Sequence, residues 1–147
     1  MNLRNVQKKK EKKLNDKVSK TDNEWKSQLS PEEYNICRGK NTEAPFTGIY
    51  LDCKDKGTYK CTCCGLELFS SETKFDSGTG WPSFFMPIKK NNIKEIEDLS
   101  NNMRRVEVVC SNCDSHLGHV FSDGPKPTGL RYCINSASLN FKKVDEK

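Results

Sequence analysis

The chain has 147 residues and a mass of 16.8 kDa, which favours one domain, since compact domains usually run to about 100–150 residues. Only 33% of the residues are hydrophobic, the mean hydropathy is −0.83, and no apolar run approaches the roughly 18 residues of a membrane span, so a membrane-spanning protein is excluded. The formal net charge of +5 is compatible with nucleic-acid binding without requiring it.

The first 24 residues form a lysine-rich segment that differs from the rest of the chain. They hold eight Lys or Arg and four Asp or Glu, and no aromatic residue. Residues 25–147 hold 17 Lys or Arg and 16 Asp or Glu. Because such a segment has little apolar surface to offset the entropy of ordering, residues 1–24 are expected to be a disordered tail. A weak tether to an anionic surface or nucleic acid is the alternative. Residues 25–147 are expected to form a single domain.

The first predicted element of the domain is a short helix that begins after Ser30. This serine can cap the helix, Pro31 suits the first helical position, and the acidic residues that follow favour the positive end of the helix dipole. The helix is expected to end near Gly39. Ordered structure is expected to start near Trp25.

From Pro45 onward the sequence is typical of short antiparallel strands and turns. Apolar and aromatic residues occur in brief runs between Gly, Asp, Lys and Ser, and three later runs also favour strands, at residues 105–109, 130–134 and 138–141. A further helix is predicted around Ile93, Ile96 and Leu99, which recur every three residues. The expected fold is mainly β with one or two short helices at the front.

Eight cysteines are many for a chain in which residues 1–24 never assemble an apolar signal segment. In the reducing compartment that this suggests, cysteines more often bind metal or do chemistry than form disulfides, and the protein is expected to be cytoplasmic. Half of them form two C-x-x-C pairs with forty-five residues between the pairs: Cys61, Cys64, Cys110 and Cys113.

These two pairs predict a structural zinc site. Four thiolates presented by two turns suit tetrahedral zinc with no open coordination position, and metal binding adds folding free energy to a chain with few apolar residues. Two disulfides, a thioredoxin-like redox pair or an iron–sulfur cluster are the alternatives. The sequence does not decide whether Cys63 is also a metal ligand, although Cys61 and Cys64 have the better spacing.

Cys133 is the candidate nucleophile among the remaining cysteines. It lies in a strand-like run, with Arg131 two residues before it and Asn135 two residues after it, so the three side chains share one strand face. Arg131 is expected to favour the thiolate and lower the thiol pKa. Asn135 can donate a hydrogen bond to a substrate or orient a histidine. The alternative is that Cys133 is a buried cysteine that only packs.

Both histidines of the chain, His116 and His119, lie in one short run. On a turn or bulged strand, with Gly118 easing the backbone, both rings can face one site. A histidine can transfer protons near neutral pH, and Cys with His is the usual pairing for thiol chemistry. Surface positions and zinc ligation are the alternatives, of which ligation is weak because four cysteines already saturate the metal.

Residues 75–85 combine turn-forming and aromatic residues. Gly78 and Gly80 impose turns, and Pro82 restricts Trp81 to an extended conformation. A rigid aromatic loop of this kind makes an apolar wall. The alternative is a satellite cluster of the hydrophobic core.

These segments resemble the methionine-R-sulfoxide reductases of the MsrB family. The resemblance covers roughly residues 25–141 and rests on long motifs in the same order: residues 42–46, both C-x-x-C pairs, and residues 68–71, 74–84, 116–121, 123–125 and 129–139. The lysine-rich tail lies outside it.

The resemblance implies a fold of two antiparallel β-sheets with short N-terminal helices and a structural four-cysteine zinc site opposite the active site. It implies that Cys133 is the nucleophile that reduces methionine-R-sulfoxide, free or in proteins, and becomes a sulfenic acid. It assigns further residues to the site, namely His116, His119 and Asn135 around the reaction and Trp81, Phe121 and Arg131 for substrate binding. The expected role is the repair of oxidised proteins. The enzyme is expected to be a monomer that uses thioredoxin or another thiol as reductant.

The sequence departs from the family pattern at Thr79, where many members carry a recycling cysteine. Another thiol must therefore reduce the sulfenic acid: an internal cysteine, thioredoxin directly, or a small thiol. Among Cys37, Cys53 and Cys63, we favour Cys53, because it lies in a polar, loop-like stretch, whereas Cys63 adjoins a zinc ligand and should be held still.

A zinc-stabilised nucleic-acid-binding or interaction module is the competing class of function. It would need basic and aromatic residues on one face, yet the chain after residue 24 is nearly neutral. Such a module also needs neither Cys133 nor the histidine pair. An enzyme is therefore the preferred interpretation, and neither nucleic acid nor a membrane is expected as a partner.

Overall fold

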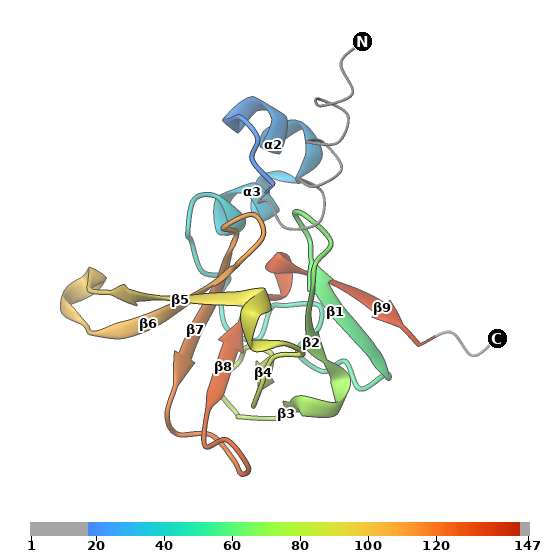
Figure 1. Cartoon of the computed structure of the whole chain (residues 1–147), viewed down its shortest axis with the longest axis vertical. Coiled ribbons are helices and arrows are strands. Elements are labelled where there is room, and N and C mark those ends of the chain that lie inside the picture. The colour runs from blue at the N-terminus through green and yellow to red at the C-terminus, as the bar shows by residue number, and fades with distance from the viewer. Residues whose placement is uncertain (1–17, 145–147) are drawn as a thin grey trace, which may run out of the picture.

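The computed structural model describes residues 18–144, and most of the predicted lysine-rich tail lies outside these residues. Within them, two short helices precede two antiparallel β-sheets (Figure 1). No helix in this part of the chain has the length and apolar character needed to cross a membrane.

Two helices, α2 (Asp22–Gln28) and α3 (Pro31–Cys37), open the described chain. Ser30 caps α3 by accepting a hydrogen bond from the backbone N–H of Glu33, and the Glu33 carboxylate accepts one from the Ser30 N–H in return. The predicted helix is therefore confirmed.

Helix α2 is an addition to the predicted elements. A second capping box begins it, in which Thr21 and Glu24 exchange the same two hydrogen bonds. Trp25 anchors the helix: it is 2% exposed and lies under the Arg38 guanidinium, 4.4 Å from the ring centroid. The expected boundary between residues 24 and 25 falls inside α2.

The nine strands of the described chain form two separate sheets. The smaller sheet has the order β2-β1-β9, with β1 (Gly57–Cys61), β2 (Glu67–Ser70) and β9 (Leu139–Lys143). The larger has the order β3-β4-β8-β7-β6-β5, with β3 (Lys74–Phe75), β4 (Ser83–Phe84), β5 (Ile93–Asp98), β6 (Arg105–Cys110), β7 (His116–Phe121) and β8 (Arg131–Ile134). Every strand pairing is antiparallel, which confirms the expected architecture.

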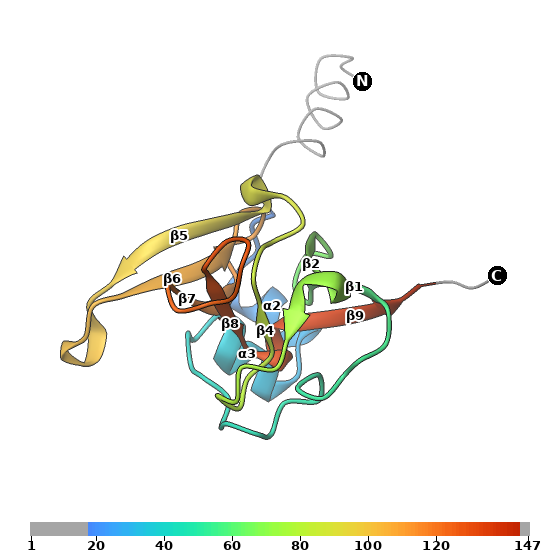
Figure 2. The ribbon, with the colours of Figure 1, turned by 90° about the horizontal axis from the view of Figure 1, so that it is seen from below.

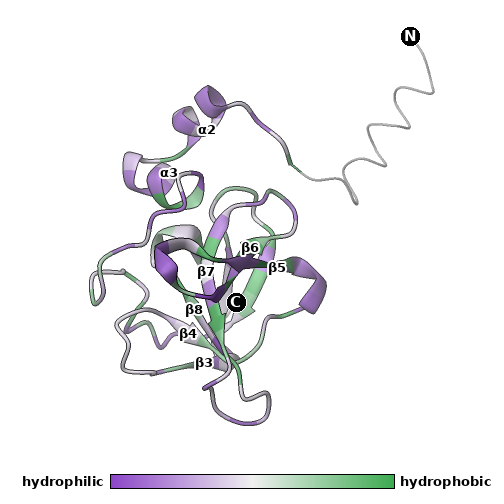
Figure 3. Ribbon diagram, turned by 90° about the vertical axis from the view of Figure 1, so that its left-hand side faces the viewer, coloured by the Kyte–Doolittle hydropathy of each residue, from purple (hydrophilic) through white to green (hydrophobic). Residues whose placement is uncertain are grey.

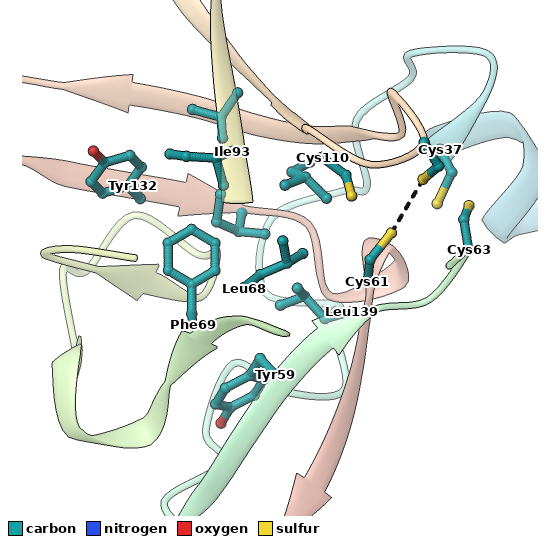
Figure 4. Close-up of a cluster of buried hydrophobic side chains, with 14 of the residues drawn as sticks. Cys37, Tyr59, Cys61, Cys63, Leu68, Phe69, Ile93, Cys110, Tyr132 and Leu139 are labelled. Carbon is teal, nitrogen blue, oxygen red and sulfur yellow. Dashed lines mark hydrogen bonds between the residues drawn. The ribbon is translucent and has the colours of Figure 1, made fainter. Parts of the chain in front are cut away.

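Aromatic side chains from both sheets pack into one core. Phe69 stacks on Phe84 at 4.5 Å between ring centroids, and Tyr59 and Tyr132 pack on these rings at 5.2 and 5.7 Å. Figure 4 shows the rings at one end of this cluster and the cysteine sulfurs at the other, beside Cys37 at the end of α3. Figure 3 shows hydrophobic residues on the central strands of the larger sheet and mostly hydrophilic ones on the helices.

The helix predicted around Ile93, Ile96 and Leu99 is wrong, because this segment forms strand β5. The strand pairs with β6 over six residues and lies at the edge of the larger sheet, in a hairpin that projects from the body of the molecule (Figures 1 and 2). Only Ile93 is buried, while Ile96 and Leu99 are exposed, so no apolar stripe meets the core as a helix would need.

The three predicted strand runs after residue 100 correspond to β6, β8 and β9, each within two residues of the expected bounds. Residues 45–56, which have the same strand-and-turn composition, contain turns and no strand. The backbone N–H of Phe46 donates to the carbonyl of Gly80 and that of Tyr50 to the Ser136 hydroxyl, which ties this segment to the loop before β4 and to the turn after β8.

Candidate active site

Strands β6, β7 and β8 place the candidate catalytic residues on one face of the larger sheet. Glu107 lies opposite His119, and His119 lies opposite Cys133. Residues paired directly across antiparallel strands point to the same face, so these three form a row across the sheet. Arg131 joins them because it lies two residues before Cys133 on β8. The predicted strand around Cys133 is therefore confirmed.

A β-bulge brings the second histidine onto the same side. The register of β6 and β7 shifts after the pair Val108–Gly118, so β7 holds one extra residue between the two histidines. In a regular strand, residues three apart face opposite sides, and the bulge removes this alternation. The rings of His116 and His119 consequently lie 5.7 Å apart between centroids. Of the two arrangements that the sequence allowed, a turn or a bulged strand, the structure has the bulged strand.

Gly118 is required where β7 and β8 come together. A Cβ atom at this position would overlap the carbonyl oxygen of Cys133. The glycine thus lets the histidine strand pack against the cysteine strand, which a larger residue would separate.

Cys133 opens into a cavity of about 250 Å³. Six of the predicted site residues line it together with four others; the lining comprises Thr42, Thr79, Trp81, Arg105, Gly118, His119, Phe121, Arg131, Cys133 and Asn135. His116 lies outside this lining and borders an adjoining cavity that shares Thr42, Arg105 and His119 with it. The structure therefore brings the candidate nucleophile, one candidate histidine and the aromatic side chains into one cavity.

Burial dominates the electrostatics of the Cys133 thiol. Burial raises its pKa above the ordinary cysteine value, while the positive charge of Arg131 and a contact with the Thr79 hydroxyl act in the opposite direction. Arg131 thus acts on the pKa in the predicted sense, and burial outweighs it. The reaction therefore benefits from a nearby base that receives the thiol proton.

Arg131 is itself held in place by two contacts. Its Nε and Nη2 atoms donate to the two carboxylate oxygens of Asp123 at 2.9 and 3.2 Å. Its guanidinium also lies 4.4 Å from the ring centroid of Phe121, a cation–π contact. These contacts orient Arg131 along the rim of the cavity.

Each histidine contacts a carboxylate. His119 Nε2 lies 2.7 Å from Asp98 Oδ2, and hydrogen bonds from His119 and Ser100 hold the pKa of Asp98 well below its usual range. His116 Nδ1 lies 2.7 Å from Glu107 Oε2. Burial lowers the pKa of His116, and the Glu107 carboxylate opposes that shift. Neither carboxylate was singled out from the sequence, since their partners lie on other strands.

Asn135 is 2% exposed, and both ends of its amide have protein partners. Its Nδ2 donates to the carbonyl of Leu117 at 3.0 Å, and its Oδ1 accepts from the N–H of Glu43 at 2.9 Å. The amide therefore ties β7 to the loop that carries Glu43, and neither histidine is among these partners.

Glu43 is a structural residue of the site that sequence reasoning missed. Its carbonyl accepts a hydrogen bond from Trp81 Nε1 at 3.0 Å, which orients the indole beside the cavity. Its buried carboxylate accepts from the backbone N–H groups of Ser136 and Ala137 at 2.9 and 3.1 Å. The only signal was its place in one of the family-like motifs, residues 42–46, because the partners of its carboxylate lie more than ninety residues away in the chain.

The four predicted metal ligands form a cluster at the ends of β1 and β6 and in the turns that follow these strands. Their sulfur atoms all lie within 4.8 Å of one another, and the ligands are Cys61, Cys64, Cys110 and Cys113. The Cys61–Cys113 and Cys64–Cys110 sulfurs are 3.6 and 3.5 Å apart. These separations are too long for disulfides and close to the roughly 3.8 Å edge of a tetrahedron with 2.3 Å metal–sulfur bonds. The donor set therefore fits one tetrahedral metal ion.

The other three cysteines lie away from the Cys133 cavity. Cys53 lines a separate cavity of about 250 Å³ that shares no lining residue with it. Cys37 and Cys63 are buried, with their thiols near the hydroxyls of Ser138 and Ser115 at 3.8 and 3.7 Å. Cys63 stands outside the metal-binding cluster, as the spacing indicated.

The chain matches known proteins over almost all of its described length. The SelR domain model matches residues 29–143. Peptide methionine sulfoxide reductase MsrB of Acinetobacter baumannii (strain AYE) is 63% identical over 130 residues, which cover 88% of this chain and 94% of that protein. The proteins of the same name from Acinetobacter baylyi and Hahella chejuensis are 61% and 59% identical, covering 89% and 88% of this chain and 94% of each relative. These matches show that the chain belongs to the SelR-domain family of MsrB peptide methionine sulfoxide reductases.

Proposed function

We propose that this protein reduces methionine-R-sulfoxide, free or in proteins, to methionine, with Cys133 as the nucleophile. One observation carries the proposal: Cys133 and His119 lie directly opposite each other on β8 and β7 and line one cavity with Trp81 and Phe121. Family membership supports the reaction type, and the site supplies the residues for it.

The reductase step is a two-electron oxygen transfer. The Cys133 thiol gives its proton to an imidazole, and the thiolate attacks the sulfoxide sulfur while the imidazolium returns the proton to the oxygen. The hydroxyl then passes to the Cys133 sulfur as the S–O bond of the substrate and the S–S bond formed by the attack break, so that methionine leaves and Cys133 becomes a sulfenic acid. We assign this proton transfer to His119, with His116 assisting. No net proton is consumed, because the proton lost by the thiol is the one gained by the oxygen.

The cavity orients the substrate by its two unlike substituents. Trp81 and Phe121 offer apolar surface to the methyl group, whereas Arg131 faces the same cavity with a charge that suits polar groups of the substrate. Asn135 completes the wall. Since methyl and oxygen occupy fixed places around the sulfur, only one sulfur epimer presents its oxygen to the histidine.

The assay that tests the function compares both sulfoxide epimers with dithiothreitol or thioredoxin as reductant. We expect turnover of the R epimer with either reductant and none above background for the S epimer, measured by separation of methionine from its sulfoxides. Turnover of the S epimer alone, or of neither, would contradict the proposed function.

A thiol must then reduce the Cys133 sulfenic acid. We propose Cys53 as the internal thiol: its sulfur attacks the sulfenic sulfur, a disulfide forms, water leaves, and thioredoxin or another thiol reduces the disulfide. Cys53 is half-buried in the polar loop before β1, with Lys74 beside its cavity. The loop must move for this step, because Cys53 and Cys133 line different cavities.

A single turnover without reductant tests this route. We expect mass spectrometry of the digested protein to show a Cys53–Cys133 disulfide, and Cys53→Ser to stop at the sulfenic acid while keeping the first turnover. If the wild-type protein stops at the sulfenic acid, which a dimedone adduct would report, the reductant acts on Cys133 directly.

We further propose that the four-cysteine cluster holds a structural zinc ion. Four thiolates and the tetrahedral sulfur spacing support zinc, which when bound clamps the turns after β1 and β6 and leaves no position for catalysis. The eight free cysteines and the thiol-dependent chemistry support a reducing, cytoplasmic setting and a role in repairing oxidised proteins. A monomer suffices, since the described chain supplies every residue of the proposed site.

A further inference from the structure

Glu107 is a carboxylate that the proposed reaction does not use, yet it is buried in the middle of the larger sheet. It is 5% exposed and lies in the row that also contains His119 and Cys133. A buried carboxylate is costly unless it is paired and hydrogen-bonded. Its partners are His116 Nδ1 at 2.7 Å and Lys40 Nζ at 3.5 Å.

The contact with His116 defines the imidazole tautomer. A 2.7 Å contact between a ring nitrogen and a carboxylate oxygen needs a proton between them, and the ionised carboxylate accepts only. The proton therefore lies on Nδ1. In the neutral ring, Nε2 of His116 then carries a lone pair and no proton.

That Nε2 atom is buried and has no hydrogen-bond partner within the described chain. A buried polar atom without a partner costs free energy, so it needs an explanation. His116 borders a cavity of about 360 Å³ that shares Thr42, Arg105 and His119 with the lining of the Cys133 cavity. A reacting group or a water that reaches Nε2 from this side would supply the partner that it lacks.

We propose that Glu107 is a positioning residue of the reductase step, which holds His116 with its proton on Nδ1 so that Nε2 is free to accept a proton when His116 assists His119. When Nε2 takes the proton from the reacting groups, the Glu107 carboxylate lies against the imidazolium and compensates its charge. The inference rests on the proposed function and adds to it the group that orients one of its histidines.

The charges around His116 determine how the rate should depend on pH. Glu107 raises the pKa of His116, whereas burial, His119 and Lys40 lower it. The other charged groups that line the adjoining cavity are Glu97, Asp98 and Arg105. Because His116 acts unprotonated, its titration shapes the acid limb of the rate profile. Removing the Glu107 charge lowers the pKa of His116 and moves this limb to lower pH.

The test compares Glu107→Gln with Glu95→Gln, an exposed carboxylate on the neighbouring strand β5. The glutamine keeps an acceptor for Nδ1–H and removes only the charge. We expect Glu107→Gln to lower the single-turnover rate on the R epimer by roughly 10- to 100-fold, to leave KM within about two-fold, and to shift the acid limb. Glu95→Gln should match the wild-type protein in the single-turnover rate, in KM and in the position of the acid limb.

Two outcomes would overturn the inference: a Glu107→Gln variant with the wild-type rate, or a lowered rate with the acid limb in place, as a purely structural role would give. The wild-type protein supplies an independent measurement, because ¹⁵N shifts distinguish the ring tautomers. A proton on Nε2 of His116 would overturn the inference even if Glu107→Gln failed to fold. Failure of the proposed function can be distinguished from failure of this inference, because in that case the wild-type protein itself would be inactive.

Discussion

Replacement of Cys133 by serine is expected to abolish reduction of methionine-R-sulfoxide while leaving the fold and metal content unchanged. The serine hydroxyl is close in size to the thiol, so the half-buried position on β8 tolerates it. The hydroxyl is a far weaker nucleophile and cannot carry the transferred oxygen as a sulfenic acid. We expect a fall in rate of more than about 10³-fold, of the order seen when an enzyme loses its nucleophile.

The measurement is a single-turnover assay on the R epimer, with circular dichroism and metal analysis of the same samples. Cys53→Ser is the matched control, because it removes a thiol of similar exposure and should keep the first turnover. Wild-type activity in Cys133→Ser would refute the assignment of the nucleophile. A loss of metal or secondary structure in Cys133→Ser would mean that the residue stabilises the fold as well.

Replacement of Cys110 by serine should, unlike Cys133→Ser, cause loss of the metal and of the folded domain. Cys110 is fully buried at the end of β6, and its sulfur lies 3.5 Å from that of Cys64. A hydroxyl is a poor ligand for zinc. Structural zinc contributes about 10–16 kcal/mol of apparent binding energy, which is comparable with the roughly 5–15 kcal/mol stability of a typical domain. The variant should therefore be unfolded at room temperature.

Metal content per chain and the thermal transition by circular dichroism check this expectation. Cys63→Ser is the matched control, because Cys63 lies beside a ligand in sequence and outside the cluster, and it should keep one zinc ion per chain. Soluble, active wild-type protein with much less than one zinc per chain would contradict a structural role for the metal. A folded Cys110→Ser variant without metal would do the same.

Features with local causes were predictable from the sequence. Helix α3 follows from a capping serine with a proline next to it. The metal cluster follows from two C-x-x-C turns, each of which presents a pair of sulfurs. The determining residues of the helix and of each turn are neighbours in the chain. The spacing of His116 and His119 allowed a turn or a bulged strand, and the pairing of β6 with β7 decided for the bulge.

Features with distant causes were decided by the tertiary structure. The apolar residues of strand β5 recur every three residues, which favours a helix. Six residue pairings with β6 outweigh that weak local preference. The pKa of Cys133 is set by its burial more than by nearby Arg131. Glu107 and Glu43 acquire their roles from partners on other strands and loops.

The cysteine spacing and the histidine pair thus indicated a metal site and thiol chemistry from the sequence alone, and the resemblance to the MsrB family indicated the reaction. The register of β6, β7 and β8 decided which groups act together, because it aligns Glu107, His119 and Cys133 in one row. Sequence patterns report interactions between residues a few positions apart. Burial, charge pairing and strand register depend on residues far apart in the chain, whose proximity exists only once the chain has folded.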